Sequence, residues 1–269
     1  MTDLLVSFMS VVLVFSLVAG CGKKESTAVA PAVSTGTQAN VAGTSSDKDF
    51  ENFKPLPIVK KQINYFAEGS PTRAIQDLDD TLDTYITHPN SPEETHYNTT
   101  LKKYVLHGTF DVRELCRLSL DKHWAERTTE EQNAFVDLMG RLLEKKAIFS
   151  KEQGQKKTKK QNLYQVTYEG DRALPSSEGV KQSLVKSTLH IPSEAMNIEL
   201  SYKLEQKDGK WVIFDIIVDG ASLLDNYRYQ FDRIIGKEGY PNLVRRMETK
   251  LKDLESKGAN NSSDTSDNS

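Results

Sequence analysis

The side chains best suited to catalysis or metal binding are five histidines and two cysteines, and their spacing argues against both roles. No HExxH pair or comparable metal motif occurs among His88, His96, His107, His123 and His190. The chain also lacks a nucleophile elbow, a P-loop and a glycine-rich dinucleotide motif. Two cysteines, Cys21 and Cys116, are too few for a disulfide scaffold or a zinc cluster. We expect Cys116, which falls on an apolar helical stripe, to be an inert core residue. The sequence therefore predicts no metal and no cofactor.

Two aspartates on the most apolar predicted strand are the remaining candidates for chemistry. Asp215 lies within the run Trp211–Val218, and Asp219 follows it. One interpretation makes Asp215 the general base of a small-molecule enzyme, in the pocket of a cone-like α+β fold. In the other interpretation Asp215 is structural, bound to a neighbouring loop or capping a helix. We favour the structural role because no partner histidine is evident.

The N-terminal residues indicate export and a lipid anchor. Residues 4–19 are apolar except for three serines, and this length suits a signal peptide better than a spanning helix of about 20 residues. The run Leu17–Cys21 resembles a bacterial lipobox, which is cleaved before a lipidated cysteine. The preceding segment departs from the pattern because it carries Asp3 and no Lys or Arg. The alternative is therefore a plain signal peptide with an incidental Cys21.

Composition divides the rest of the chain into a linker, a folded domain and a tail. We predict a signal peptide at 1–20, a lipidated cysteine and flexible linker at 21–49, a folded domain at 50–257 and a disordered tail at 258–269. The net charge of −3 and the lack of a nucleic-acid-binding motif argue against a nucleic-acid partner. The run Lys145–Lys160 holds seven lysines and one acid, typical of a solvated loop but also suited to anionic headgroups.

The elements expected to position these residues are helices, then strands, then helices. Ser70-Pro71 predicts a helix start, a second helix is expected over 111–125, and Thr129 with Gln132 predicts a capping box for a third. Alternation predicts strands near 164–168, 183–191 and 198–206, and Asp208-Gly209 predicts a hairpin turn into a central strand at 211–218. Two more helices follow, one capped by Ser222 and ended by Gly236, the other opened by Pro241. This order predicts an α+β fold with an antiparallel sheet of about four strands flanked by helices.

Two groups of motifs resemble the MlaC (toluene-tolerance) family over roughly Leu56 to Glu255. The first comprises Phe110–Val112, Arg117–Leu120, His123–Trp124 and Thr129–Phe135. The second, which is more specific, comprises Gly209–Val212, Asp215–Ile216, Asp219–Leu223, Asn226–Arg228, Gln230–Phe231 and Lys237–Tyr240. The resemblance implies a periplasmic protein without enzymatic activity that binds a glycerophospholipid by its acyl chains in a deep apolar cavity. It also implies two partners, an inner-membrane ABC-type lipid transporter complex and an outer-membrane lipid complex.

A lipidated Cys21 departs from the soluble shuttles typical of the family. Gly22, where enteric bacteria place an aspartate for inner-membrane retention, favours the outer membrane.

From this resemblance and the apolar stripes we predict the residues that contact lipid. They are Tyr164, Val166, Tyr168, Ile198, Leu200, Tyr202, Phe214, Ile216, Leu138 and Leu142. We expect a structural role for Trp211, Tyr227, Arg228 and Phe231, with Tyr227 packed inward and Arg228 paired with a carboxylate or carbonyl. A structural envelope lipoprotein with a fully packed interior is a third hypothesis.

Overall fold

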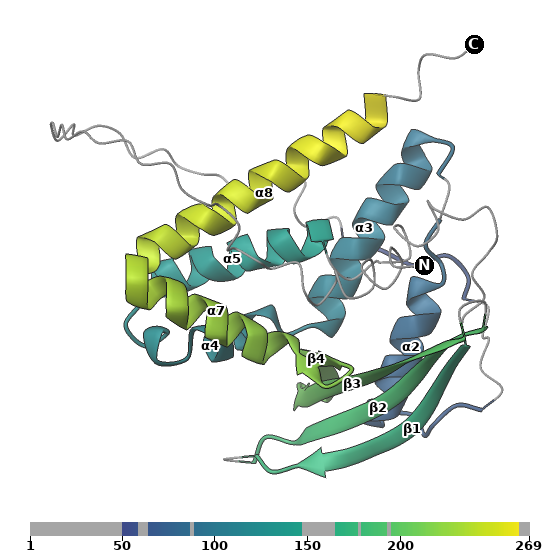
Figure 1. The fold of residues 1–269 in the computed structure, drawn as a ribbon. Helices are drawn as coiled ribbons and strands as arrows, with labels where there is room; N and C mark the ends of the chain where they lie inside the picture. The colour runs from purple at the N-terminus through teal and green to yellow at the C-terminus, as the bar shows by residue number, and fades with distance from the viewer. Residues whose placement is uncertain are drawn as a thin grey trace, which may run out of the picture.

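A computed structural model describes residues 50–58, 64–86, 89–146, 165–176, 179–192 and 195–263. Cys21, Tyr164 and most of the lysine-rich run lie outside these residues, as do the predicted signal peptide and nearly all of the predicted linker. The described chain is an α+β fold in which helices precede and follow a meander of antiparallel strands (Figure 1). The fold class expected from the sequence is confirmed.

Among the described residues, four helices and a short 3-10 turn come before the sheet. Their bounds are α2 Pro71–Leu82, α3 Pro92–Thr109, α4 Val112–Leu120, η2 Asp121–His123 and α5 Thr129–Lys146. Ser70 and Ser91 are N-caps, each followed by a proline in the first turn, and their hydroxyls accept from the backbone N–H of Arg73 and Glu94.

Several predicted helix boundaries were wrong. Helix α3 was missed, and the helix predicted over 111–125 ends at Leu120, where Asp121 adopts a positive φ of 49°. The capping box lies one residue earlier than predicted and consists of Thr128 and Glu131. The backbone N–H of Thr128 donates to the Glu131 carboxylate at 3.0 Å, and the backbone N–H of Glu131 donates to Thr128 Oγ1 at 3.2 Å.

The sheet consists of four long strands and one very short strand, in sequence order. They are β1 Gln165–Leu174, β2 Gln182–Ile191, β3 Met196–Lys207, β4 Lys210–Val218 and β5 Ala221–Ser222. Asp208 and Gly209, both at positive φ, join β3 to β4 as predicted. Strand β4 is not central: its outer edge meets only β5 and a bridge to Phe110 among the described residues. It is apolar on both faces because α3, α4 and α7 all contact it.

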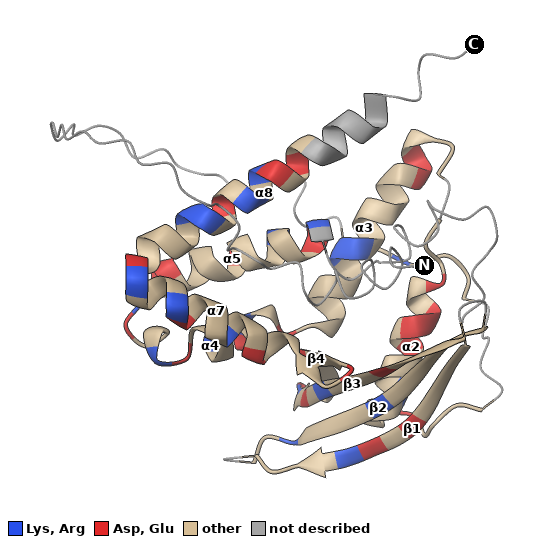
Figure 2. Cartoon of the chain, in the orientation of Figure 1, with Lys and Arg blue, Asp and Glu red and all other residues tan. Residues whose placement is uncertain are grey.

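The last two helices are α7 Leu223–Glu238 and α8 Tyr240–Ser263. Ser222 caps α7 as predicted, but the helix passes Gly236 and ends at Gly239, whose φ is 83°. Helix α8 continues to Ser263, beyond the boundary expected at Lys257. Lys, Arg, Asp and Glu residues recur along the coloured part of α8, whereas much of the sheet carries no charged residue (Figure 2).

Two apolar cores result, one in a helix bundle and one under the sheet. The bundle core joins α4, α5, α7 and α8, with Phe135, Leu142, Phe231, Leu243 and Met247 at its centre. The sheet core lies between α2, α3 and the strands, and we define it by Ile75, Leu78, Leu101, Val105, Val185, Tyr202, Leu204 and Ile213. Helix α3 contributes to both, since Leu106 belongs to the bundle core. No helix in the described residues is long and apolar enough to cross a membrane.

Candidate functional site

The face of the sheet that packs on α2 and α3 is the candidate site, and we call it the inner face. Its position is given by Val185 and Tyr202, which pair across β2 and β3 and belong to the sheet core with residues of both helices. Successive residues of a strand point to opposite faces. The register therefore places on the inner face six of the predicted lipid-contacting residues: Val166, Tyr168, Ile198, Leu200, Tyr202 and Ile216.

Apolar side chains continue along the inner face beyond the sheet core. Leu189, Ile191 and Ile198 are each no more than 6% exposed, and they form a second cluster, here called the distal cluster. Partly buried Val166 and Leu200 pack against it. Because Leu200 also packs against the sheet core, the two clusters form one apolar strip supplied by all four long strands.

Buried polar groups of α2 hold the edge of this face together. Tyr168 donates to Asp79, and burial, reinforced by that carboxylate, raises the pKa of Tyr168 far above its usual value. Thr72 donates to Asp171 of β1 at 2.7 Å. Tyr65 donates to the buried Asp80 carboxylate at 2.7 Å. These bonds join α2 to β1 and to the segment before α2, and they fix the position of α2 against the sheet.

Three other predicted lipid residues, Leu138, Leu142 and Phe214, fall outside the alternation that defines this face. Leu142 is fully buried in the bundle core, and Leu138 borders a hollow of about 520 Å³ between α5 and α8. Phe214 is the extra residue of a β-bulge, because Lys203 pairs with Asp215 and Leu204 with Ile213. The structure thus places Leu138 and Leu142 in the helix bundle, away from the inner face. A deep lipid cavity on the inner face remains a prediction.

Asp215 is engaged in structural contacts. Its carboxylate accepts from the backbone N–H of Leu224 at 3.0 Å and from Ser222 Oγ at 2.8 Å, and it pairs with Lys203 Nζ at 2.9 Å. The side chain is fully buried where α7 begins. Asp219, at φ 47°, accepts from the backbone N–H of Glu199. Asp215 therefore connects β4 to α7 and β3, and Asp219 connects the end of β4 to β3.

The described residues show neither a reactive cysteine nor a cluster of metal ligands. Burial raises the pKa of the Cys116 thiol, which disfavours the thiolate needed by a nucleophile. Within the described residues no three His, Cys, Asp or Glu side chains are grouped as metal ligands would be.

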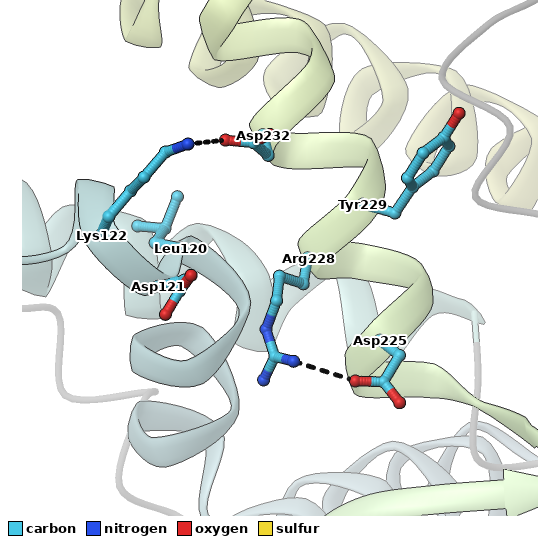
Figure 3. Close-up of a pocket in the computed structure, with 7 residues that line it drawn as sticks. All are labelled: Leu120, Asp121, Lys122, Asp225, Arg228, Tyr229 and Asp232. Atoms are coloured by element: carbon cyan, nitrogen blue, oxygen red, sulfur yellow. Dashed lines mark hydrogen bonds and ion pairs between the residues drawn. The ribbon is translucent and has the colours of Figure 1, made fainter.

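The motif around Arg228 joins α7 to α4. Arg228 Nε donates to the Leu118 carbonyl at 3.1 Å, and its Nη1 pairs with Asp225 at 3.1 Å (Figure 3). Tyr227 is 2% exposed and stacks on Phe231 with ring centroids 5.5 Å apart. Trp211 Nε1 donates to the Gly69 carbonyl at 2.9 Å, which ties β4 to the start of α2. A hollow of about 370 Å³ lies beside Arg228, and its lining includes the charged residues Asp121, Lys122 and Asp232.

Sequence reasoning missed the residues that cover the inner face. Leu101 and Val105 of α3 are at most 1% exposed, yet the run Pro92–Thr109 has too few apolar residues for a clear helical stripe. The usable signal was Ser91-Pro92, which has the same form as Ser70-Pro71.

Comparison with known proteins identifies a family and similar solved structures. The family model described as MlaC protein matches residues 76–249. A solved structure of a phospholipid-binding protein from Ralstonia solanacearum, in complex with a phospholipid, is similar at 19% sequence identity. The match covers 68% of this chain and 97% of that one, with a TM-score of 0.51, and it shows a common fold. No curated protein sequence matches the chain.

Proposed function

Because the chain belongs to the MlaC family, we propose that it binds a glycerophospholipid by its acyl chains and carries it between the two membranes of the envelope. The observation that carries this proposal is the apolar strip on the inner face. Four strands contribute to it, and α2 and α3 pack on its sheet-core part. The acyl chains would lie between this strip and the two helices.

The energetics of the ligand require a surface of this kind. Two acyl chains of about 15 methylenes each hold roughly 24 kcal/mol of hydrophobic free energy, at ~0.8 kcal/mol per methylene. A carrier must nearly match that value, or the lipid stays in the bilayer. Scattered surface leucines cannot do so, whereas a strip enclosed between two layers removes most of the chain from water.

Family membership also supports the cellular part of the proposal. We place the protein in the periplasm, receiving and delivering lipid at an outer-membrane lipid complex and an inner-membrane ABC-type transporter complex. A lipidated Cys21 would keep it attached to one membrane, with the outer membrane favoured. Binding and transfer need no reacting group, which agrees with the structural contacts of Asp215.

Lipid uptake from vesicles tests the binding function directly. We expect native mass spectrometry of the purified protein to show one phospholipid bound, and more protein to become loaded after incubation with phosphatidylglycerol vesicles. If the protein carries no lipid and takes up none, the proposed function is wrong.

Adjacent isoleucines of β4 provide a matched control for the binding face. Ile216 pairs with Tyr202 and belongs to the inner face, whereas Ile217 points to the opposite face; both are partly buried. Each truncation to alanine should lower the free energy of unfolding by about 1–3 kcal/mol, since each removes a half-buried side chain. Only Ile216→Ala should reduce lipid loading. Equal loading of the two variants would place the lipid elsewhere.

A further inference from the structure

Ser187 carries a buried hydroxyl with no hydrogen-bond partner in the part of the chain that the structure describes. Its side chain belongs to the inner face of β2, where it lies opposite Tyr168 of β1 and Leu200 of β3. The residue is 2% exposed, and its Oγ has no hydrogen-bond partner among the described residues. Buried hydroxyls are nearly always satisfied, because leaving one unpaired forfeits the hydrogen bonds it makes to water in the unfolded chain.

Three polar side chains near Ser187 have hydrogen-bond partners within the protein. Tyr168 donates its hydroxyl to Asp79. Ser183, on the same strand and face and also 2% exposed, donates to the Arg172 carbonyl at 2.9 Å. Thr188, on the opposite face, donates to Glu169 at 3.1 Å. The unpaired hydroxyl of Ser187 therefore lies beside polar side chains that are paired.

The position of Ser187 matches a boundary in the apolar strip. Val185, on one side along the strand, belongs to the sheet core, and Leu189, on the other side, belongs to the distal cluster. Leu200, its cross-strand neighbour, packs against both. The Ser187 hydroxyl thus lies at the junction of the two apolar clusters.

We propose that Ser187 is the polar anchor of the lipid site and that its Oγ donates a hydrogen bond to an ester carbonyl of the bound glycerophospholipid. This inference rests on the proposed function and adds a ligand class, ester-linked glycerolipids. Acyl chains offer no acceptor. The inner-face neighbours of Ser187 carry no charge; they are Tyr168, Val185, Leu189 and Leu200. A phosphate buried against them would lack a cationic partner there, which is unfavourable. The ester carbonyl is a neutral acceptor at the point where the acyl chains diverge.

The experiment compares two lipids that differ only in the ester carbonyls. Vesicles of diacyl phosphatidylglycerol and of its dialkyl ether analogue, with equal chain lengths, are mixed and offered to the purified protein. Native mass spectrometry then gives the ratio of the two bound lipids. We expect the wild type to prefer the ester lipid by about 3- to 10-fold, the contribution of one hydrogen bond.

Three variants separate the anchor from a structural effect. Ser187→Ala should lose the preference while its thermal stability stays equal or rises, because it removes an unpaired hydroxyl. Ser187→Thr keeps a hydroxyl on a strand and should keep the preference. Ser183→Ala breaks an existing hydrogen bond, so it should lower thermal stability and leave the preference unchanged.

Failure of the anchor is distinguishable from failure of the proposed function. A wild type that takes up both lipids equally, or a Ser187→Ala variant that retains the wild-type preference, would overturn the anchor and leave lipid binding intact. A wild type that takes up neither lipid would overturn both.

Discussion

Asp215 shows how a carboxylate that suggests catalysis serves the fold at the scale of single residues. It binds the first turn of α7 through Leu224 N and Ser222 Oγ, and it neutralises Lys203 on β3. Asp215→Asn keeps the volume but removes the charge, leaving Lys203, whose side chain is 28% exposed, without its counterion. We expect the free energy of unfolding to fall by about 1–3 kcal/mol, measured by urea denaturation, with lipid loading per folded molecule unchanged. Asp219→Asn is the control, because asparagine retains the oxygen that accepts from Glu199 N and tolerates the φ of 47°. Loss of lipid loading in folded Asp215→Asn would return a ligand-contacting role to this carboxylate.

At the scale of secondary-structure elements, Arg228 of α7 holds that helix against α4. Its ion pair with Asp225 is 62% exposed on the aspartate side and contributes little. The bond from Nε to the Leu118 carbonyl is part-buried and satisfies the last turn of α4. Arg228→Ala should therefore lower the free energy of unfolding by about 1–2 kcal/mol, which corresponds to roughly 2–8 °C in Tm for a domain of this size. Arg233→Ala, at an exposed site on the same helix, should change Tm by much less. If Arg228→Ala left Tm unchanged but abolished delivery of lipid to an acceptor membrane, Arg228 would serve recognition of a partner.

For the whole molecule, the question is whether the folded domain diffuses or is tethered. The predicted linker from Gly22 to Lys48 would give a flexible tether with a root-mean-square span of about 29 Å, so the domain would act close to its own membrane. Multiple acyl chains on one cysteine hold a protein at a membrane essentially permanently, whereas one chain binds only marginally. We expect the full-length wild type in the membrane fraction of cells and Cys21→Ser in the soluble periplasmic fraction, both loaded with lipid. A wild-type protein found in the soluble fraction would show that Cys21 is not an anchor and that the protein is a free shuttle.

The sequence alone determined the elements that depend on residues close together along the chain. Ser70-Pro71 starts α2, Asp208-Gly209 turns β3 into β4, and the alternation from Ile198 to Leu204 defines a strand with one apolar face. Caps, turns and strand periodicity are chemistry within a few residues, so they are visible in one sequence.

Only the tertiary structure decided which of these faces meet. The stripe of α5 that carries Leu138 and Leu142 is as apolar as the strands, but it packs in the helix bundle and not on the inner face. Both faces of β4 are apolar because helices cover it from two sides, not because it is central. The lack of a partner for Ser187 could not be foreseen either, since a serine on a strand usually finds an acceptor. Whether it does depends on residues of other elements, which only the folded chain brings together.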